Sequence, residues 1–185
     1  MLWDKKRQTI VNNESADIMR ILNSGFGDLA NEQIDLYPAA LTAEFEAFDE
    51  RLYDRVNDGV YKAGFASSQG AYEEAVDTLF LEMVSLNERL SDGRPYLFGD
   101  DITGSDIRLF VTMIRFDAAY FGLFKCNKAP LSAFPHLSRH TKRLYVMGPI
   151  KRTVNLGHIK QGYYSVKALN PNGIVPVGPD NLFAA

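Results

Sequence analysis

The spacing of hydrophobic side chains changes near Glu14 and divides the chain into a short strand-like part and a long helical part. Before Glu14, the apolar pair Leu2-Trp3 and the β-branched residues 9–11 flank the polar residues 5–8, which is the pattern of a β-hairpin. From Glu14 onward, apolar side chains recur at helical spacing until a glycine ends the pattern. We therefore expect a β-β-α unit in residues 1–25.

Beyond residue 37, apolar side chains recur every three or four positions through most of the chain, which predicts amphipathic helices. The helices that we expect span approximately residues 38–57, 71–90, 103–116, 136–146 and 149–154. The third of them is apolar almost all round, which is typical of a helix at the centre of a bundle. At its start, Thr103 is followed three residues later by Asp106, a spacing close to that of a capping box.

This order of elements predicts a mainly α protein with two lobes, because a β-β-α piece followed by a run of helices does not form one alternating sheet. We expect residues 1–25 to form the first unit, residues 26–36 a linker and residues 37–156 a helical bundle. Residues 157–185 are rich in glycine and proline, and we expect them to form an irregular tail that packs on the bundle.

The composition narrows the class of protein. The 185 residues carry a net charge of −3, and no segment reaches the ~18 apolar residues that a membrane span requires. The N-terminus lacks a signal-peptide pattern, and the scattered basic residues form no patch for nucleic acid. A single cysteine, Cys126, excludes an internal disulfide and a multi-cysteine metal site. These features favour a cytoplasmic protein without a metal, membrane or nucleic-acid partner.

Glu14 and Ser15 stand at the expected N-terminus of the first helix, a position that favours anions through free N–H groups and the helix dipole. Ser15 adds a hydroxyl donor and Glu14 can pair with a cation, so the pair suits a ligand that has both a carboxylate and an ammonium group. On the pattern alone, an ordinary helix cap is the simpler interpretation.

Tyrosines provide the second candidate site. We expect Tyr61 in a loop after the helix stop at residues 57–59, beside Lys62, and we expect Tyr163 and Tyr164 in the tail. A phenol can stack on an aromatic ligand and hydrogen-bond its hydroxyl. The alternative is that these rings only hold loops onto the bundle, and the pattern alone favours that alternative.

The remaining polar candidates have simpler interpretations. His158 can orient a tail hydroxyl or act as an acid or base, but a structural hydrogen bond is the simpler role. Cys126 is the only thiol, but it follows the most apolar helix, where a free cysteine is usually a small buried hydrophobe. Arg108, Arg115 and Asp117 lie on or near that helix, and we interpret them as structural charges.

Short runs of sequence carry a further signal. They are residues 2–5 with 9–15, 57–66, 108–110 with 115–117, 124–127, 158–164 and 170–176. Each run is unspecific alone. Their order and combination, over nearly the whole chain, resemble the glutathionyl-hydroquinone reductases of the omega-like, or Xi-class, glutathione transferase family.

The resemblance implies a helical glutathione transferase bundle that follows a remnant of a thioredoxin-like lobe, a glutathione co-substrate, and a homodimer with its interface on the helical lobe. It also implies that Glu14 and Ser15 bind the γ-glutamyl group of glutathione. Tyr61 and one of Tyr163 and Tyr164 would line the hydroquinone pocket. Further candidates for the site are His158 and Lys62.

The family's catalytic cysteine lies in a Cys-Pro turn near the start of the thioredoxin-like lobe, before the first residue present here. We therefore expect a truncated chain that is inactive alone and contains no catalytic residue. In the whole enzyme, the cysteine would attack the glutathionyl sulfur and release the hydroquinone, and a second glutathione would resolve the mixed disulfide. The alternative is a non-catalytic, transferase-like assembly module. A ligand-binding regulator would need a DNA-binding segment, which the pattern does not contain.

Overall fold

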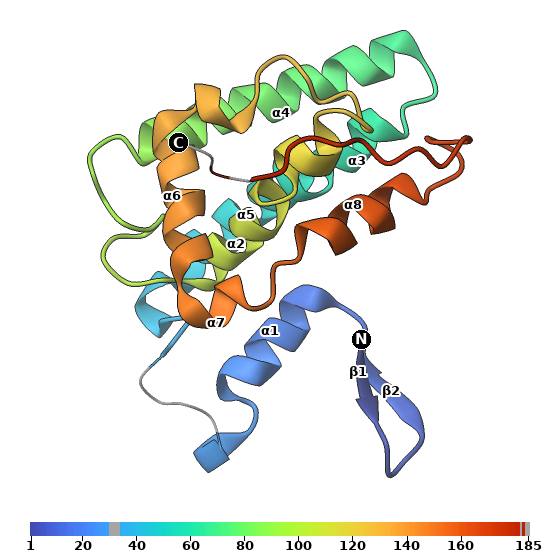
Figure 1. Cartoon of the computed structure of the whole chain (residues 1–185). Coiled ribbons are helices and arrows are strands. Elements are labelled where there is room, and N and C mark those ends of the chain that lie inside the picture. The colour runs from blue at the N-terminus through green and yellow to red at the C-terminus, as the bar shows by residue number, and fades with distance from the viewer. Residues whose placement is uncertain (30–33, 182, 184–185) are drawn as a thin grey trace.

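A computed structural model describes residues 1–29, 34–181 and 183 (Figure 1). The strands and α-helices are β1 (Leu2–Asp4), β2 (Thr9–Asn12), α1 (Ser15–Ser24), α2 (Thr42–Leu52), α3 (Gly59–Gly64), α4 (Gln69–Arg89), α5 (Gly104–Met113), α6 (Pro135–Val146), α7 (Gly148–Lys151) and α8 (Leu156–Tyr164). Two π-helical turns, η3 (Tyr53–Asn57) and η4 (Phe116–Tyr120), follow α2 and α5. This mainly helical fold with an N-terminal two-stranded sheet confirms the predicted fold class.

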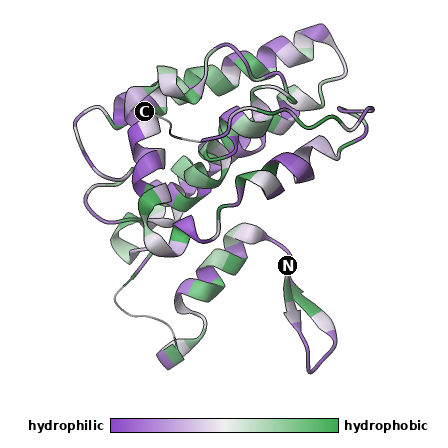
Figure 2. Cartoon of the chain, in the orientation of Figure 1, coloured by the Kyte–Doolittle hydropathy of each residue, from purple (hydrophilic) through white to green (hydrophobic). Residues whose placement is uncertain are grey.

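The N-terminal unit is a hairpin followed by α1. Strands β1 and β2 are antiparallel, with Trp3 opposite Ile10. Helix α1 begins after Glu14, whose side chain accepts a hydrogen bond from the N–H of Ala16. None of the side chains of β1, β2 or α1 is buried, and Figure 2 shows hydrophobic segments on both the hairpin and α1. This unit therefore contributes surface and a helix N-terminus rather than a core of its own.

The helical lobe has one large hydrophobic core. Helix α4 packs against α3 and α6, and α8 packs against η4 (Figure 1). Its fully buried large side chains include Leu79 and Met83 of α4, Leu109 and Met113 of α5, and Leu137 of α6. Each of them stabilises the fold by about 1.5–3 kcal/mol relative to an exposed position. The core therefore holds α5 and η4, which contribute side chains to the site described below.

A buried polar network fixes the start of α5. The Oδ2 atom of Asp106 accepts hydrogen bonds from the N–H and the Oγ1 hydroxyl of Thr103, at 2.8 and 2.7 Å. Its Oδ1 atom accepts one from the N–H of Leu97 at 2.8 Å and lies 2.8 Å from Nε2 of His140. The predicted capping box is confirmed, and two partners outside its local pattern complete the network.

The predicted helix stop before Tyr61 was wrong. The N–H of Asp58 donates to the carbonyl of Tyr53 at 2.8 Å and closes η3, and α3 follows at once. Gly59 does not end the helix because its backbone keeps an ordinary φ instead of the left-handed conformation of a helix-ending glycine. Tyr61 therefore projects from a helix and not from a loop.

The tail also differs from the prediction, because helix α8 occupies residues that we expected to be irregular from 157 onward. The side chain of Asn155 accepts from the N–H of His158 at 2.9 Å and caps the helix, and packing against η4 compensates for two glycines within it. Beyond α8, the described residues to 181 form no helix or strand. The ammonium of Lys160 holds part of this segment through the carbonyl of Val177, at 2.5 Å.

The predicted division into four segments stays a prediction. Residues 30–33 of the expected linker, and residues 182, 184 and 185 of the expected tail, lie outside the described residues. Within the described chain, no helix is long and apolar enough to cross a membrane. The same residues contain no group of three or more His, Cys, Asp or Glu side chains that could hold a metal ion.

Candidate functional site

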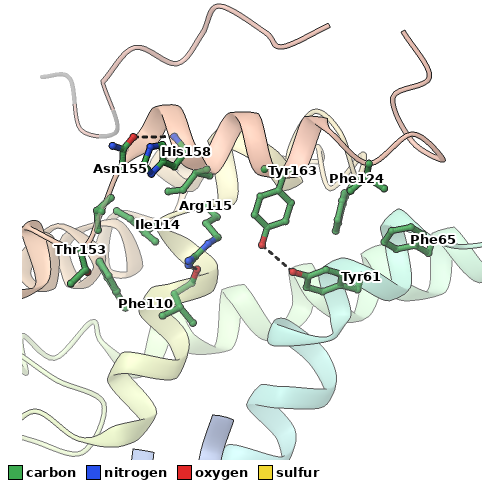
Figure 3. A pocket seen from close by; sticks show the side chains of 15 residues that line it. Tyr61, Phe65, Phe110, Ile114, Arg115, Phe124, Thr153, Asn155, His158 and Tyr163 are labelled. Carbon is green, nitrogen blue, oxygen red and sulfur yellow. Dashed lines mark hydrogen bonds between the residues drawn. The ribbon is translucent and has the colours of Figure 1, made fainter. Parts of the chain in front are cut away.

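Three tyrosine hydroxyls meet between α3, η4 and α8, and we call these residues the tyrosine cluster: Tyr61, Tyr120 and Tyr163. The Oη atom of Tyr163 lies 2.9 Å from that of Tyr61 and 2.5 Å from that of Tyr120. Figure 3 shows the rings of Tyr61 and Tyr163 pointing toward each other from α3 and α8. The cluster thus joins side chains that are up to 102 positions apart in the sequence.

The ring of Phe124 supports the tyrosine cluster. Its centroid lies 5.2 Å from the rings of both Tyr61 and Tyr120 and 5.9 Å from that of Tyr163. A Cβ atom at Gly64 would lie only 2.5 Å from the Phe124 ring, so glycine is what allows this ring to approach α3. A larger residue there would displace the ring against which the cluster packs.

Two phenols of the cluster, Tyr120 and Tyr163, are protonated at neutral pH. Burial raises the pKa of Tyr120, and the hydrogen bond with Tyr163 raises it further. Burial also raises the pKa of Tyr163 to about 12. The hydrogen bond with Tyr120 and the positive charge of Arg115 act in the opposite direction and lower this pKa. Neutral hydroxyls can donate hydrogen bonds to a ligand and accept them in return, which suits the recognition of another phenol.

Two cavities adjoin the cluster. The first, which we call the α8 cavity, has a volume of about 500 Å³ and lies between α3, α5 and α8 (Figure 3). The second, which we call the α1 cavity, has a volume of about 550 Å³ and lies between the N-terminus of α1, η3 and α5. Both volumes are ordinary for small-molecule sites. Tyr61, Val111, Arg115 and Tyr163 line both cavities and form the boundary between them.

The structure brings most of the predicted site residues to these cavities. Glu14 and Ser15, at the start of α1, line the α1 cavity. Tyr61 and Tyr163 line both, and His158 lines the α8 cavity. The two groups of candidates, which we expected in separate lobes, therefore line two cavities that share the residues Tyr61 and Tyr163.

Two predicted site residues lie elsewhere. Tyr164 lines neither cavity; its ring packs against the core, with its hydroxyl close to Gly122. Lys62 points away from the cluster, and its ammonium lies 2.5 Å from the carboxylate of Asp54 and 3.8 Å from that of Asp58. Successive residues of a helix point in different directions, so Tyr163 faces the cavities while Tyr164 does not.

Sequence reasoning missed Tyr120 and gave Arg115 only a structural role. Tyr120 is buried, lines the α1 cavity and bonds the other two phenols. The sequence did contain a signal for Tyr120, since its hydroxyl lies inside an apolar stretch. A tyrosine buried there usually has a hydrogen-bond partner. By contrast, Arg108 pairs with Asp49 at 3.0 Å, although it also lines the α1 cavity, and Asp117 accepts from the N–H of Leu131.

Comparisons with known proteins relate the chain to glutathione transferases. A family model for the C-terminal domain of glutathione S-transferase matches residues 69–143. The glutathionyl-hydroquinone reductase PcpF of Sphingobium chlorophenolicum is 48% identical over 180 residues, which are 97% of this chain and 57% of the relative. The chain therefore spans little more than half the length of this curated relative.

Solved structures give the same result. The glutathione-bound structure of YqjG, a glutathione transferase homolog from Escherichia coli K-12, has a TM-score of 0.92 and 44% identity and covers 97% of this chain and 59% of that one. The glutathione S-transferase Xi of Phanerochaete chrysosporium has a TM-score of 0.94 and 45% identity, with 98% and 63% covered. Similarity at this level extends through the N-terminal unit, the bundle and most of the tail.

Proposed function

The chain belongs to the glutathione S-transferase family, and from this premise we propose that it supplies the hydroquinone pocket and part of the glutathione site of a glutathionyl-hydroquinone reductase. The observation that carries the proposal is that Tyr61 and Tyr163 stand between the two cavities, with Glu14 and Ser15 in one of them. A conjugate of an aromatic ring with a peptide needs two such adjoining sites.

The α1 cavity is the proposed glutathione side. The γ-glutamyl end of glutathione has a carboxylate and an ammonium group. Ser15 begins α1, so its N–H and hydroxyl are available donors for the carboxylate. Glu14 is exposed at the cavity wall and can accept from the ammonium.

The tyrosine cluster is the proposed hydroquinone side. Its neutral phenols provide donors and acceptors for a hydroquinone hydroxyl, and the aromatic walls around Phe124 provide a surface on which a ring can stack. Tyr163 replaces the pair of tail tyrosines in our prediction, because Tyr164 lines neither cavity.

The nucleophile in this proposal is a cysteine thiolate that does not belong to these 185 residues. It forms a disulfide with the glutathionyl sulfur, the bond from sulfur to the ring breaks, and the ring carbon takes up a proton. A second glutathione then reduces the mixed disulfide. One hydroquinone and one glutathione disulfide leave, and the cysteine thiol is restored.

A chimera tests this assignment. In it, the present chain replaces the 180 aligned residues of PcpF from S. chlorophenolicum. We expect the chimera to convert a glutathionyl-hydroquinone and glutathione into hydroquinone and glutathione disulfide, with native PcpF as the reference. A folded chimera that lacks turnover while PcpF is active would favour the alternative, a non-catalytic assembly module.

Removing a hydroxyl from the tyrosine cluster should weaken use of the hydroquinone substrate. A neutral hydrogen bond contributes roughly 0.5–1.5 kcal/mol, so Tyr61→Phe and Tyr163→Phe should each lower kcat/KM of the chimera about two- to twelvefold. Tyr72→Phe and Tyr164→Phe are matched controls, since neither side chain lines the cavities. Unchanged kinetics in both cluster variants would mean that these rings only pack loops against the bundle.

Neutralising Glu14 should weaken glutathione binding first. Glu14→Gln keeps an oxygen for the α1 cap but loses the charge that we assign to the ammonium. A charge-assisted hydrogen bond contributes about 1.5–3 kcal/mol, so the Kd of the chimera for glutathione, measured by calorimetry, should rise roughly ten- to hundredfold.

The matched control for Glu14 is Asp17→Asn. It removes a carboxylate from the same first turn of α1, but Asp17 does not line the α1 cavity. A second control is a glutathione analogue in which glutaryl replaces γ-glutamyl and the ammonium is absent. Glu14→Gln should hardly affect its binding, and an equal loss for both ligands would refute the proposed pairing.

The homodimer is also a proposal that follows from the family. The exposed apolar side chains Leu81 and Val84 on α4 give the helical lobe a surface that a second copy can cover.

A further inference from the structure

We propose that Arg115 makes the α8 cavity a subsite for an aromatic group that bears a carboxylate. This subsite goes beyond the proposed function, because it concerns a ligand group that neither glutathione nor a plain hydroquinone provides. Its basis is the environment of one guanidinium group and the composition of the cavity around it.

Arg115 lacks the acidic partner that Arg51, Arg55 and Arg108 have. Arg51 and Arg55 pair with the buried carboxylate of Glu82, and Arg108 pairs with Asp49. Among the described residues, no carboxylate lies within ion-pair distance of Arg115, which donates from Nη1 to the carbonyl of Val111, one turn earlier.

Arg115 is partly buried and lines both cavities. A positive charge taken partly out of water without a partner is costly, and an anionic ligand would remove that cost. Figure 3 shows Arg115 between the aliphatic and aromatic wall at Phe110 and Ile114 and the pair Tyr61–Tyr163.

An anion in the α8 cavity would lie near the positive charge of Arg115 and would meet no negatively charged side chain in the lining. None of its 15 lining residues is Asp or Glu. Beside Arg115, the amide of Asn155 and the imidazole of His158 are polar groups that can also contact an anion. The lining therefore favours negative over neutral ligands.

The hydrophobic side chains that line the cavity determine which kind of anion can bind there. Phe65, Phe110 and Phe124 line the cavity together with aliphatic side chains, so its larger part suits an aromatic ring. A guanidinium group binds a planar carboxylate through two parallel hydrogen bonds. An inorganic phosphate would satisfy the single arginine but would leave these walls without a partner. The combination selects an aryl carboxylate, such as an acidic substituent on an aromatic substrate.

A pair of probes of nearly equal shape tests the inference on the chain itself. 1-Naphthoate carries the carboxylate, and 1-naphthamide is its neutral counterpart. By calorimetry, we expect the chain to bind naphthoate at least about tenfold more tightly, the usual effect of a charge-assisted hydrogen bond. Arg115→Gln should abolish this preference and leave naphthamide affinity unchanged.

Two further variants complete the test. Arg152→Gln removes a charge from an exposed residue that lines neither cavity, and it should keep the preference. Arg115→Lys keeps the charge without the two parallel donors, and it should keep only part of the preference. The inference is overturned if the unmodified chain binds both probes equally, or if the preference survives in a folded Arg115→Gln variant. These outcomes do not involve thiol transfer, so they are independent of the proposed function.

Discussion

Replacing Asp106 with alanine should lower the free energy of unfolding of the chain by about 3–5 kcal/mol, because each buried donor that loses its acceptor costs roughly 1–3 kcal/mol. The carboxylate is fully buried and accepts from Thr103 and Leu97. Alanine would leave these donors and the side chain of His140 without their partner in the core. The start of α5 and the loop before it would lose their common anchor.

Urea unfolding followed by circular dichroism measures this effect. For a change of this size, the midpoint of unfolding should fall by roughly 1–3 M urea. The control is Asp101→Ala, an exposed acid in the same loop, which should change the midpoint little. If both variants unfolded at the same urea concentration as the unmodified chain, the network at Asp106 would contribute nothing to stability.

The local half of this network could be predicted from the sequence, and the distant half could not. Thr103 and Asp106 are three residues apart, and this spacing is sufficient to indicate a capping box. His140 is 34 positions from Asp106, so their contact depends on how α6 packs across α5. Hydrophobic periodicity predicts that two helices form, but it does not determine which polar side chains meet between them.

The same distinction explains the site. The place of Glu14 and Ser15 at the start of α1 was predictable, because a helix N-terminus has a local signature. Tyr120 was not, because nothing near it indicates that its hydroxyl meets Tyr163, 43 positions later. The predicted position of Tyr61 in a loop was wrong, because the expected helix stop at residues 57–59 does not occur. Instead, η3 continues directly into α3. The contact of Tyr120 with Tyr163 and the helical position of Tyr61 thus depend on tertiary packing, which local sequence patterns do not reveal.

Helix α8 shows how packing can override composition. Glycine disfavours a helix by about 1 kcal/mol relative to alanine, and α8 contains Gly157 and Gly162. The cap at Asn155 and the contact with η4 compensate for this cost. Because residues 163 and 164 belong to a helix, their side chains point in different directions, and only Tyr163 lines the cavities.

The single thiol of the chain should be almost inert in the folded protein. Cys126 is fully buried, and burial raises its pKa to about 12. At pH 8, a thiol with this pKa is about 0.01% thiolate, whereas an ordinary cysteine is roughly a quarter thiolate. Because the thiolate is the nucleophile, iodoacetamide should label native Cys126 roughly a thousandfold more slowly than the unfolded chain.

This inertness bears directly on the proposed function. Cys126 is the only cysteine of the chain, so the isolated chain should produce no glutathione disulfide from glutathionyl-hydroquinones. Mass spectrometry of the labelled protein, with and without denaturant, measures the reactivity, and Cys126→Ser identifies the labelled site. Rapid labelling of the native chain, or turnover that Cys126→Ser abolishes, would make this thiol the nucleophile. Slow labelling without turnover would leave the chain dependent on a cysteine from another polypeptide segment, as the proposed mechanism requires.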